Sequence, residues 1–290
     1  MDPKTAMYVA QGIHGLAYGM MLFLVASGLT LIFGMMGILN LAHASFAMLA
    51  AYFCFTVLKL TGNFWVGLLI APVVVGICGV LTERFLLRTV HKHGHLAELL
   101  ITLGIMTLIM ELVKLFWGTE SLVVKIPEGL GGLLKIAGLT YPVYRLFVIG
   151  LSILILGFMA LILFKTRLGK IVQAAVSDSE MVSALGINTP LVFMLVFGIG
   201  IWLAGVAGAV AGPLLTVFPG LADQLGMDAF VVVVVGGFGS LGGAFIVALF
   251  LGELNAYGIQ FIPRLAPVLM FAFMALVLAF KPMGLFGERE

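Results

Sequence analysis

Polar side chains are rare within the long apolar segments of this chain, and three of them are of types that could do chemistry there. Asn40 and His43 stand at i, i+3 at the start of one apolar segment, and Glu253 lies near the middle of another. A polar group at membrane depth is costly, so it usually pairs with a neighbour or lines the path of a solute. Asn40 and His43 therefore either hydrogen-bond backbone at a helix end or belong to a pathway, with Ser45 beside them. Glu253 is equally either a helix-to-helix hydrogen-bonding group or a pathway group.

The motifs of the common enzyme classes are missing from the sequence. There is no Gly-Lys-Ser/Thr ending of a phosphate-binding loop, no His-Glu-x-x-His metal motif and no Gly-x-Ser-x-Gly nucleophile turn, and Ser240 stands in Gly-Ser-Leu instead. We therefore expect no catalysis and no cofactor on this chain. Any ATP and magnesium that it depends on would be bound by another chain.

Three histidines alternate in a short basic segment, at positions 91, 93 and 95. A zinc site needs further cysteine, histidine or carboxylate ligands in a suitable geometry, and none accompanies these histidines within the basic turn. The segment is predicted to be a solvated loop rather than a metal site.

A glycine-rich run follows an apolar stretch that is too short to cross a bilayer. Residues 229–238 are apolar for only about ten positions before GGFGSLGG, and ten helical residues cover about half of the hydrocarbon core. Such a segment is either a broken or re-entrant helix over 228–243, tolerated where protein or a water-filled cavity surrounds it, or an ordinary tight turn at the cytoplasmic edge. In the first case the pathway would include Gly236, Gly237, Gly239 and Ser240.

The elements that position these groups are membrane helices. Hydrophobic residues make up 62% of the 290 residues, charged residues only 10%, and the mean hydropathy is +1.23, which excludes a water-soluble surface. A net charge of +2 does not indicate a nucleic-acid partner. The fold is predicted to be all-α, a single polytopic membrane domain over 1–290 in contact with lipid. Its apolar runs that are long enough to span a bilayer are 8–33, 40–60, 64–88, 96–117, 146–164, 191–216, 243–262 and 265–280.

Small residues at four-residue spacing predict where these helices pack closely. Such faces occur at Gly15 and Gly19 and along two later spans, and they allow another helix to approach in lipid. The two later stripes consist of Ala204, Gly208 and Gly212, and of Ala244, Ala248 and Gly252.

Basic segments predict the orientation of the spans. The segments 84–92 and 165–170 carry lysine and arginine, so we expect both on the cytoplasmic side, with 118–145 as the outer, periplasmic connection. Nine crossings, with the broken element counted, place the N-terminus outside and the C-terminus inside. A re-entrant element over 229–242 would instead leave both termini outside.

The segment 165–188, KTRLGKIVQAAVSDSEMVSALGIN, is a long charged stretch with helical spacing. Ser177 and Glu180 have the spacing of a capping box, which predicts a helix that opens at Asp178 and closes at Gly186. Apolar stripes run over 168–175 and over 181–185. Taken alone, these stripes lie either on the chain's own helices and the lipid interface or in a groove on a soluble partner.

Three separated runs resemble one family. TRLGKIVQAAVSDSEMVSALGIN, GLTLIFGMMGILNLAHASFAMLAAY at 28–52 and GGFGSLGGAFIVALFLGE at 236–253, with KPMGLFG at 281–287, are similar to the permease subunits of branched-chain amino acid ABC importers of the LivH type. The family motif Asn-Phe-Ala-His-Gly-Glu reads Asn-Leu-Ala-His-Ala-Ser at 40–45, so the role of its acidic residue does not carry over. The resemblance implies that 165–188 are cytoplasmic coupling helices that contact the ATPase. The residues expected at this contact are Arg167, Gly169, Lys170, Ser177, Glu180, Met181, Val182, Leu185 and Gly186.

The resemblance also implies partners and a location. We expect a type II-like importer permease in a bacterial inner membrane, paired with a second, related permease chain, two ATP-binding cassette subunits and a periplasmic substrate-binding protein. The solute would be a branched-chain amino acid or a related small polar or amphipathic solute such as urea, an amide or an aromatic acid. A stand-alone secondary transporter or small-solute channel is the alternative, although ion coupling would then rest on Glu253 with little other support.

Overall fold

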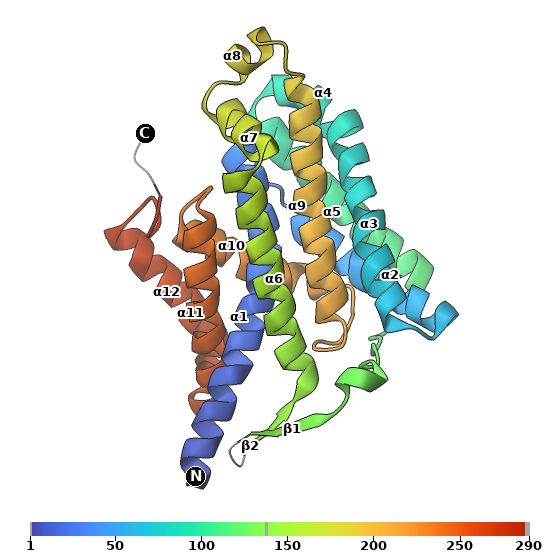
Figure 1. Cartoon of the computed structure of the whole chain (residues 1–290), viewed down its shortest axis with the longest axis vertical. Coiled ribbons are helices and arrows are strands. Elements are labelled where there is room, and N and C mark those ends of the chain that lie inside the picture. Colours follow the sequence, from blue (N-terminus) through green and yellow to red (C-terminus); the bar gives the residue numbers. More distant parts are fainter. Residues whose placement is uncertain (1, 137–138, 288–290) are drawn as a thin grey trace.

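Long apolar helices dominate the computed structural model, which describes residues 2–136 and 139–287 (Figure 1). Within those residues, eight helical segments have the length and hydropathy of membrane spans, as the apolar runs predict. The helices that make these spans are α1 (Pro3–Met36), α2 (His43–Thr61), α3 (Phe64–Thr82), α5 (His95–Trp117), α6 (Val143–Lys165), α9 (Thr189–Ala211), α11 (Leu241–Phe261) and α12 (Ala266–Phe280).

Shorter elements connect the spans. They are the π-helix η1 (Glu83–Leu87), α4 (Arg88–Val90), the 3₁₀ turns η2 (His91–His93), η3 (Glu128–Leu130) and η4 (Pro263–Leu265), and the helices α7 (Arg167–Ser177), α8 (Ser179–Ala184) and α10 (Leu221–Gly236). The predicted outer connection also holds an antiparallel hairpin, β1 (Leu133–Ile136) with β2 (Leu139–Pro142), which the all-α prediction did not include. Its turn, at 137–138, lies outside the described residues.

The two basic segments lie at the same end of the bundle, as predicted. Arg88 and His91 of the first segment and Ala175 of α7 border one cavity, and α4, α7 and α8 gather at the top of Figure 1. The start of α1 and the β1–β2 hairpin lie at the opposite end. Phe286, beyond α12, borders the same cavity as Arg88. The two ends of the described chain therefore lie on opposite sides of the bundle, in agreement with nine crossings.

The predicted small-residue face of α1 packs directly on α11. A Cβ placed on Gly19 would stand 2.6 Å from the Ala248 carbonyl oxygen, and one on Gly252 would stand 2.3 Å from that of Gly15. Contacts this short leave no room for a side chain. The spacing of glycine and alanine on the two helices therefore predicted the correct helix pair.

The small-residue stripe of Ala204, Gly208 and Gly212 marks α9, which lies at the centre of the bundle against α1, α2 and α3. A Cβ on Gly208 would stand 1.8 Å from the Ala47 carbonyl oxygen of α2. On another side of α9, a Cβ on Gly200 would stand 2.9 Å from the Gly28 carbonyl oxygen of α1. Most of the second half of α9 is consequently buried.

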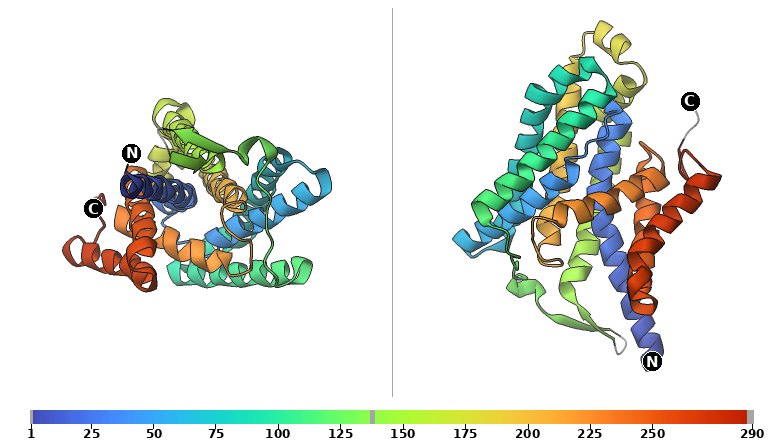
Figure 2. Two further views of the ribbon diagram at one scale, coloured as in Figure 1. Left: turned by 90° about the horizontal axis from the view of Figure 1, so that it is seen from below. Right: turned by 180° about the vertical axis from the view of Figure 1, so that it is seen from behind.

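The short helix α10 is longer than the apolar pattern predicts. It begins at Leu221, so Asp223 and Asp228, which were expected in an outer loop, belong to its first turns. Asp228 accepts a hydrogen bond from the Tyr18 hydroxyl of α1, which gives this acid a partner within the protein. With 16 residues, or about 24 Å, α10 is still shorter than the bilayer core. In the right-hand view of Figure 2 it crosses the bundle at a steep tilt to α1.

A single methyl group should test the importance of the seam between α9 and α2. We expect Gly208→Ala to lower the free energy of unfolding by about 1–3 kcal/mol, because its Cβ would overlap the Ala47 carbonyl oxygen. The control is Gly104→Ala, since Gly104 of α5 has no atom within 4 Å of a Cβ position. Melting temperatures of the two purified variants in detergent provide the comparison. Equal melting temperatures would contradict the packing described for α9.

Candidate functional site: the cavity beside the coupling helices

A cavity of about 1040 Å³ lies at the end of the bundle that carries the basic segments. Segments far apart in the sequence meet around it: the end of α1, the η1–α4 elbow, the α7–α8 region and the loop between α10 and α11. Ala175 and Ser179 belong to the predicted coupling segment, whereas Gly239 and Ser240 belong to the predicted pathway. The segment predicted for coupling and the glycine-rich loop predicted for the pathway therefore border one cavity.

The junction between α6 and α7 is held in a fixed geometry. The Thr166 hydroxyl accepts a hydrogen bond from the Gly169 amide at 3.2 Å, which caps α7. A Cβ on Gly169 would stand 2.2 Å from the Leu163 carbonyl oxygen, so glycine is required where α7 turns back over the end of α6. Arg167 and Lys170 flank this turn and are exposed, consistent with a water-facing end of the bundle.

The helix α8 is capped at both ends, although its N-terminal cap is not the predicted residue. Ser177 is the last residue of α7, and the capping oxygen is Asp178 Oδ1, which accepts a hydrogen bond from the Met181 amide at 2.8 Å. The capping box on Ser177 and Glu180 is therefore wrong by one residue, although Glu180 does lie in the first turn. Gly186 closes the helix at φ 84°, as predicted. The Ile187 amide then donates to the Val182 carbonyl, the pattern of a Schellman motif.

The apolar stripe of α8 is divided between the interior and the surface. Val182 is buried within the chain and does not extend the exposed stripe, contrary to the single apolar stripe predicted for 181–185. Met181 and Leu185 remain 59% and 73% exposed at the outermost part of this end (Figure 1). Two large apolar side chains at the tip of a charged, capped helix have the character of a contact surface.

The glycine-rich run is a tight connection between α10 and α11, and it has a structural reason for most of its glycines. Gly237 ends α10 at φ 97°, and Ser240 caps α11 by accepting from the Gly243 amide at 3.1 Å. A Cβ on Gly243 would stand 2.1 Å from the Gly236 carbonyl oxygen. Gly239, at φ 80°, borders the cavity and lies over Gly34 of α1.

The segment that follows α12 completes this connection. The Leu285 and Phe286 amides donate to the Val235 and Gly236 carbonyls at 2.8 and 3.2 Å, which satisfies the last carbonyls of α10. Phe238 packs on Phe33 with ring centroids 4.3 Å apart. Within 228–243, which was predicted as a broken helix or a tight turn, only residues 237–240 are irregular, because α10 extends to Gly236 and α11 begins at Leu241. This short connection is covered by protein on one side and borders the cavity on the other.

Asn40, His43 and Ser45 are at most 3% exposed and do not border the cavity. The Asn40 Oδ1 accepts from the Ala42 amide at 3.1 Å, and Nε2 of His43 lies 3.0 Å from the Val25 carbonyl oxygen. Asn40 precedes α2, which begins at His43. These bonds correspond to the structural alternative, in which polar groups bind backbone at a helix start. The Nδ2 of Asn40, the Nδ1 of His43 and the hydroxyl of Ser45 have no partner among the described residues.

Glu253 lies on the seam between α11 and α1, away from the cavity. A Cβ on Gly15 would stand 2.6 Å from the Glu253 Oε2, so the carboxylate rests directly on the α1 backbone. It also borders a smaller cavity of about 400 Å³ with Tyr8 and Tyr257, near the start of α1.

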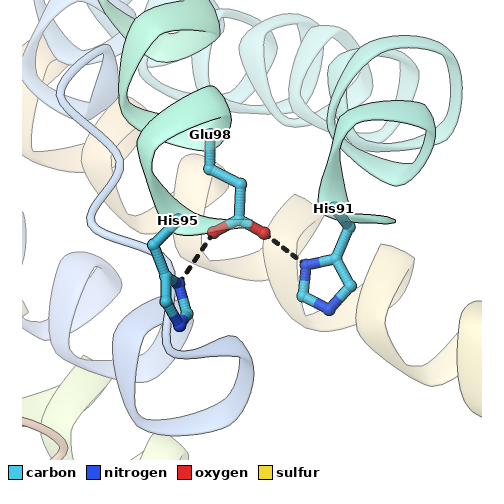
Figure 3. A network of polar contacts seen from close by, with 3 residues as sticks. All are labelled: His91, His95 and Glu98. Atoms are coloured by element: carbon cyan, nitrogen blue, oxygen red, sulfur yellow. Dashed lines mark hydrogen bonds and ion pairs between the residues drawn. The ribbon is translucent and has the colours of Figure 1, made fainter. Parts of the chain in front are cut away.

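The histidine segment, which was predicted to be a solvated loop, is bound by an acidic residue that lies outside the basic turn. Glu98, in the first turn of α5, is 2% exposed and binds Nδ1 of His91 and Nδ1 of His95 through its two oxygens (Figure 3). His93 remains in the exposed turn. The carboxylate does not complete a metal site, since no cluster with metal-binding geometry occurs among the described residues. The i, i+3 spacing of His95 and Glu98 was the signal that could have predicted this contact.

Known proteins share both the sequence and the fold of this chain. A family model described as the permease component of the branched-chain amino acid transport system matches residues 13–278. The high-affinity branched-chain amino acid transport system permease protein BraD of Pseudomonas aeruginosa is 29% identical over 304 residues, which cover 99% of this chain and 98% of BraD. The corresponding LivH protein of Escherichia coli K12 is 29% identical over 306 residues, 100% of this chain and 99% of LivH.

A solved structure confirms the predicted fold class. PsaBC from Streptococcus pneumoniae, in complex with Fab, superposes with a TM-score of 0.53 over 92% of this chain and 89% of that chain, at 11% sequence identity. The fold is that of an all-α, multi-pass membrane protein like the type II ABC importer permeases. Since the family model extends over nearly the whole length, the chain belongs to the family of branched-chain amino acid transport system permease components.

Proposed function

We propose that this chain is the membrane-spanning permease subunit of an ABC importer and forms half of the pathway for a branched-chain amino acid or a related small amphipathic solute. The observation that supports this most strongly is the joint cavity: α8, which exposes Met181 and Leu185, shares it with the loop of Gly239 and Ser240. A partner that grips α8 from outside would therefore act on a wall of the same cavity as the pathway loop.

The local structure suits transmission of force through α7 and α8. Gly169 allows α7 to sit against the last carbonyls of α6, and caps at both ends keep α8 helical despite its six residues. Val182 anchors α8 to the chain while Met181 and Leu185 face outward. In this proposal, two ATP-binding cassette subunits contact this surface and carry the ATP and magnesium.

A second permease chain would cover the exposed polar part of α10. Asp223 and Gln224 are exposed in the first turns of this short helix, and lipid does not accommodate such groups. A related permease chain facing α10 would enclose them along a shared water-filled pathway. We place the assembly in a bacterial inner membrane, with α7 and α8 in the cytoplasm and a periplasmic substrate-binding protein at the end that carries the β1–β2 hairpin.

Replacing Leu185 with a charged residue should uncouple the ATPases. We expect Leu185→Asp to remove about 1.5–3 kcal/mol of contact free energy and to abolish stimulation of ATP hydrolysis by the loaded binding protein. The measurement is the ATPase rate of the reconstituted complex with and without loaded binding protein. The control is Leu60→Asp, because Leu60 is 79% exposed near the end of α2. Normal stimulation of ATP hydrolysis in Leu185→Asp would show that the ATPases do not dock on this part of the chain.

Filling the cavity at the α10–α11 loop should block transport. Gly239→Leu places a side chain at φ 80°, which costs about 1–2 kcal/mol, and directs it to a wall shared by α1 and the cavity. We expect uptake into proteoliposomes to be lost while the complex still assembles. Gly242→Leu is the control, because Gly242 lies in the first turn of α11 with open space around it. Unchanged uptake in Gly239→Leu would make this loop a simple connection.

A further inference from the structure

One carboxylate oxygen on the cavity wall has no hydrogen-bond partner. Glu83, the first residue of η1, is 2% exposed, and within residues 2–136 and 139–287 its Oε2 has no hydrogen-bond partner and its carboxylate forms no ion pair. Glu98, by contrast, has both oxygens bound by His91 and His95. Arg88 and His91 interact with Glu83 electrostatically without bonding to it, and a buried carboxylate oxygen without a hydrogen bond is costly, so a cationic donor that binds Glu83 from the cavity would be favoured.

The π-helix places a cation one turn from this carboxylate. The Arg88 amide donates to the Glu83 carbonyl, an i→i+5 bond that aligns these two residues on one face of η1. Both residues border the cavity, and they form no ion pair with each other. In an α-helix, residues five apart would point in different directions. The extra residue in the turn is consistent with an acid and a guanidinium on the same cavity wall.

Apolar side chains on the same cavity wall could contact the apolar part of a ligand. Phe33, Met35, Phe238 and Met283 border the same space, and Phe33 and Phe238 pack on one another. The volume, about 1040 Å³, is at the upper end of small-molecule sites and leaves room for water beside a small solute. An acid, a guanidinium and an aromatic wall match the three parts of an aliphatic α-amino acid.

We propose that this cavity binds an aliphatic α-amino acid from the cytoplasmic side, with the ammonium group on Glu83, the carboxylate group on Arg88 and the side chain against Phe33 and Phe238. The inference rests on the proposed function for the class of solute and for the side of the membrane. A bound amino acid would lie in a cavity that η1, the Gly239 loop and Ser179 of α8 all border, next to both predicted functional segments.

The first test needs no variant. The complex of permease chains and ATPases, in nanodiscs and without the periplasmic binding protein, is incubated with radiolabelled L-leucine and two competitors. We expect 3-methylbutylamine, which keeps the ammonium group for the buried Glu83, to displace leucine. We expect 4-methylpentanoate, which keeps only the carboxylate group for the exposed Arg88, to fail at concentrations at which unlabelled leucine displaces fully, because water competes for that contact. Absence of leucine binding, or equal displacement by both competitors, would overturn the proposal.

The second test assigns the site. Glu83→Gln keeps the shape of the side chain and removes its charge, and we expect the affinity for leucine to fall about tenfold or more. The control is Glu111→Gln, because Glu111 is an exposed acid of α5 that already pairs with Lys114 at 2.7 Å, and its loss should leave binding unchanged. Unchanged affinity in Glu83→Gln would overturn the assignment.

Further outcomes distinguish this proposal from a partner contact at Glu83 and from a failure of the proposed function. If wild type binds no leucine and Glu83→Gln loses its ATPase chains on gel filtration, Glu83 holds a cationic side chain of the partner, and the amino-acid site is refuted. If the chain never purifies with ATPases and supports no uptake, the proposed function itself fails. Normal uptake and stimulated ATP hydrolysis without leucine binding at this cavity would refute only the present inference.

Discussion

Direct backbone contact at glycine and alanine is the constraint on which this structure depends. Lipid is as apolar as a leucine side chain, so membrane helices gain little from hiding apolar surface and are held by close packing instead. Gly208 on Ala47 and Gly252 on Gly15 bring backbones together without intervening side chains. These seams join α1 and α9 to their neighbours and make a rigid central part of the bundle. The outward faces of α5, α6 and α12 are left with large apolar side chains that suit lipid.

The helix α10 differs from these closely packed spans because it is short, and the loop that follows it borders the cavity. With 16 residues it is shorter than the bilayer core is thick, so its last carbonyls lie within the protein and need partners there. The segment after α12 supplies them through the Leu285 and Phe286 amides. The loop that follows α10 turns sharply at Gly237 and Gly239, both in left-handed conformations, and stands at the cavity edge rather than at a lipid interface. The loop after the short helix, rather than the helix itself, therefore contributes to the cavity wall.

The coupling segment occupies the other wall of that space. Its two helices are short and would be unstable alone, but Gly169 fixes α7 on α6 and Asp178 and Gly186 cap α8. The histidines bound to Glu98 hold the opposite elbow in place.

Local composition and short spacing determined much of what is seen. The membrane class, the eight spans, the α1–α11 seam and the left-handed Gly186 all follow from runs of apolar residues or from residues one helical turn apart, and such signals survive in any tertiary context. The cap of α8 was misplaced because Ser177 and Asp178 are both good capping residues, and only the path of the chain selects between them. Asp223 and Asp228 resembled loop residues because α10 begins with polar turns. Asp228 accepts a hydrogen bond from Tyr18 of α1, which is distant in the sequence.

Tertiary structure alone decided the contacts between segments far apart in the sequence. Neither the docking of residues 285 and 286 on α10 nor the joint cavity of η1, α7–α8 and the Gly239 loop has a local signature. The missing hydrogen bond at Oε2 of Glu83 likewise depends on the segments packed around this residue. Apolar runs specify that a helix exists, whereas the identity of its neighbours depends on which close-packed arrangement leaves the fewest polar groups unpaired in a medium without water.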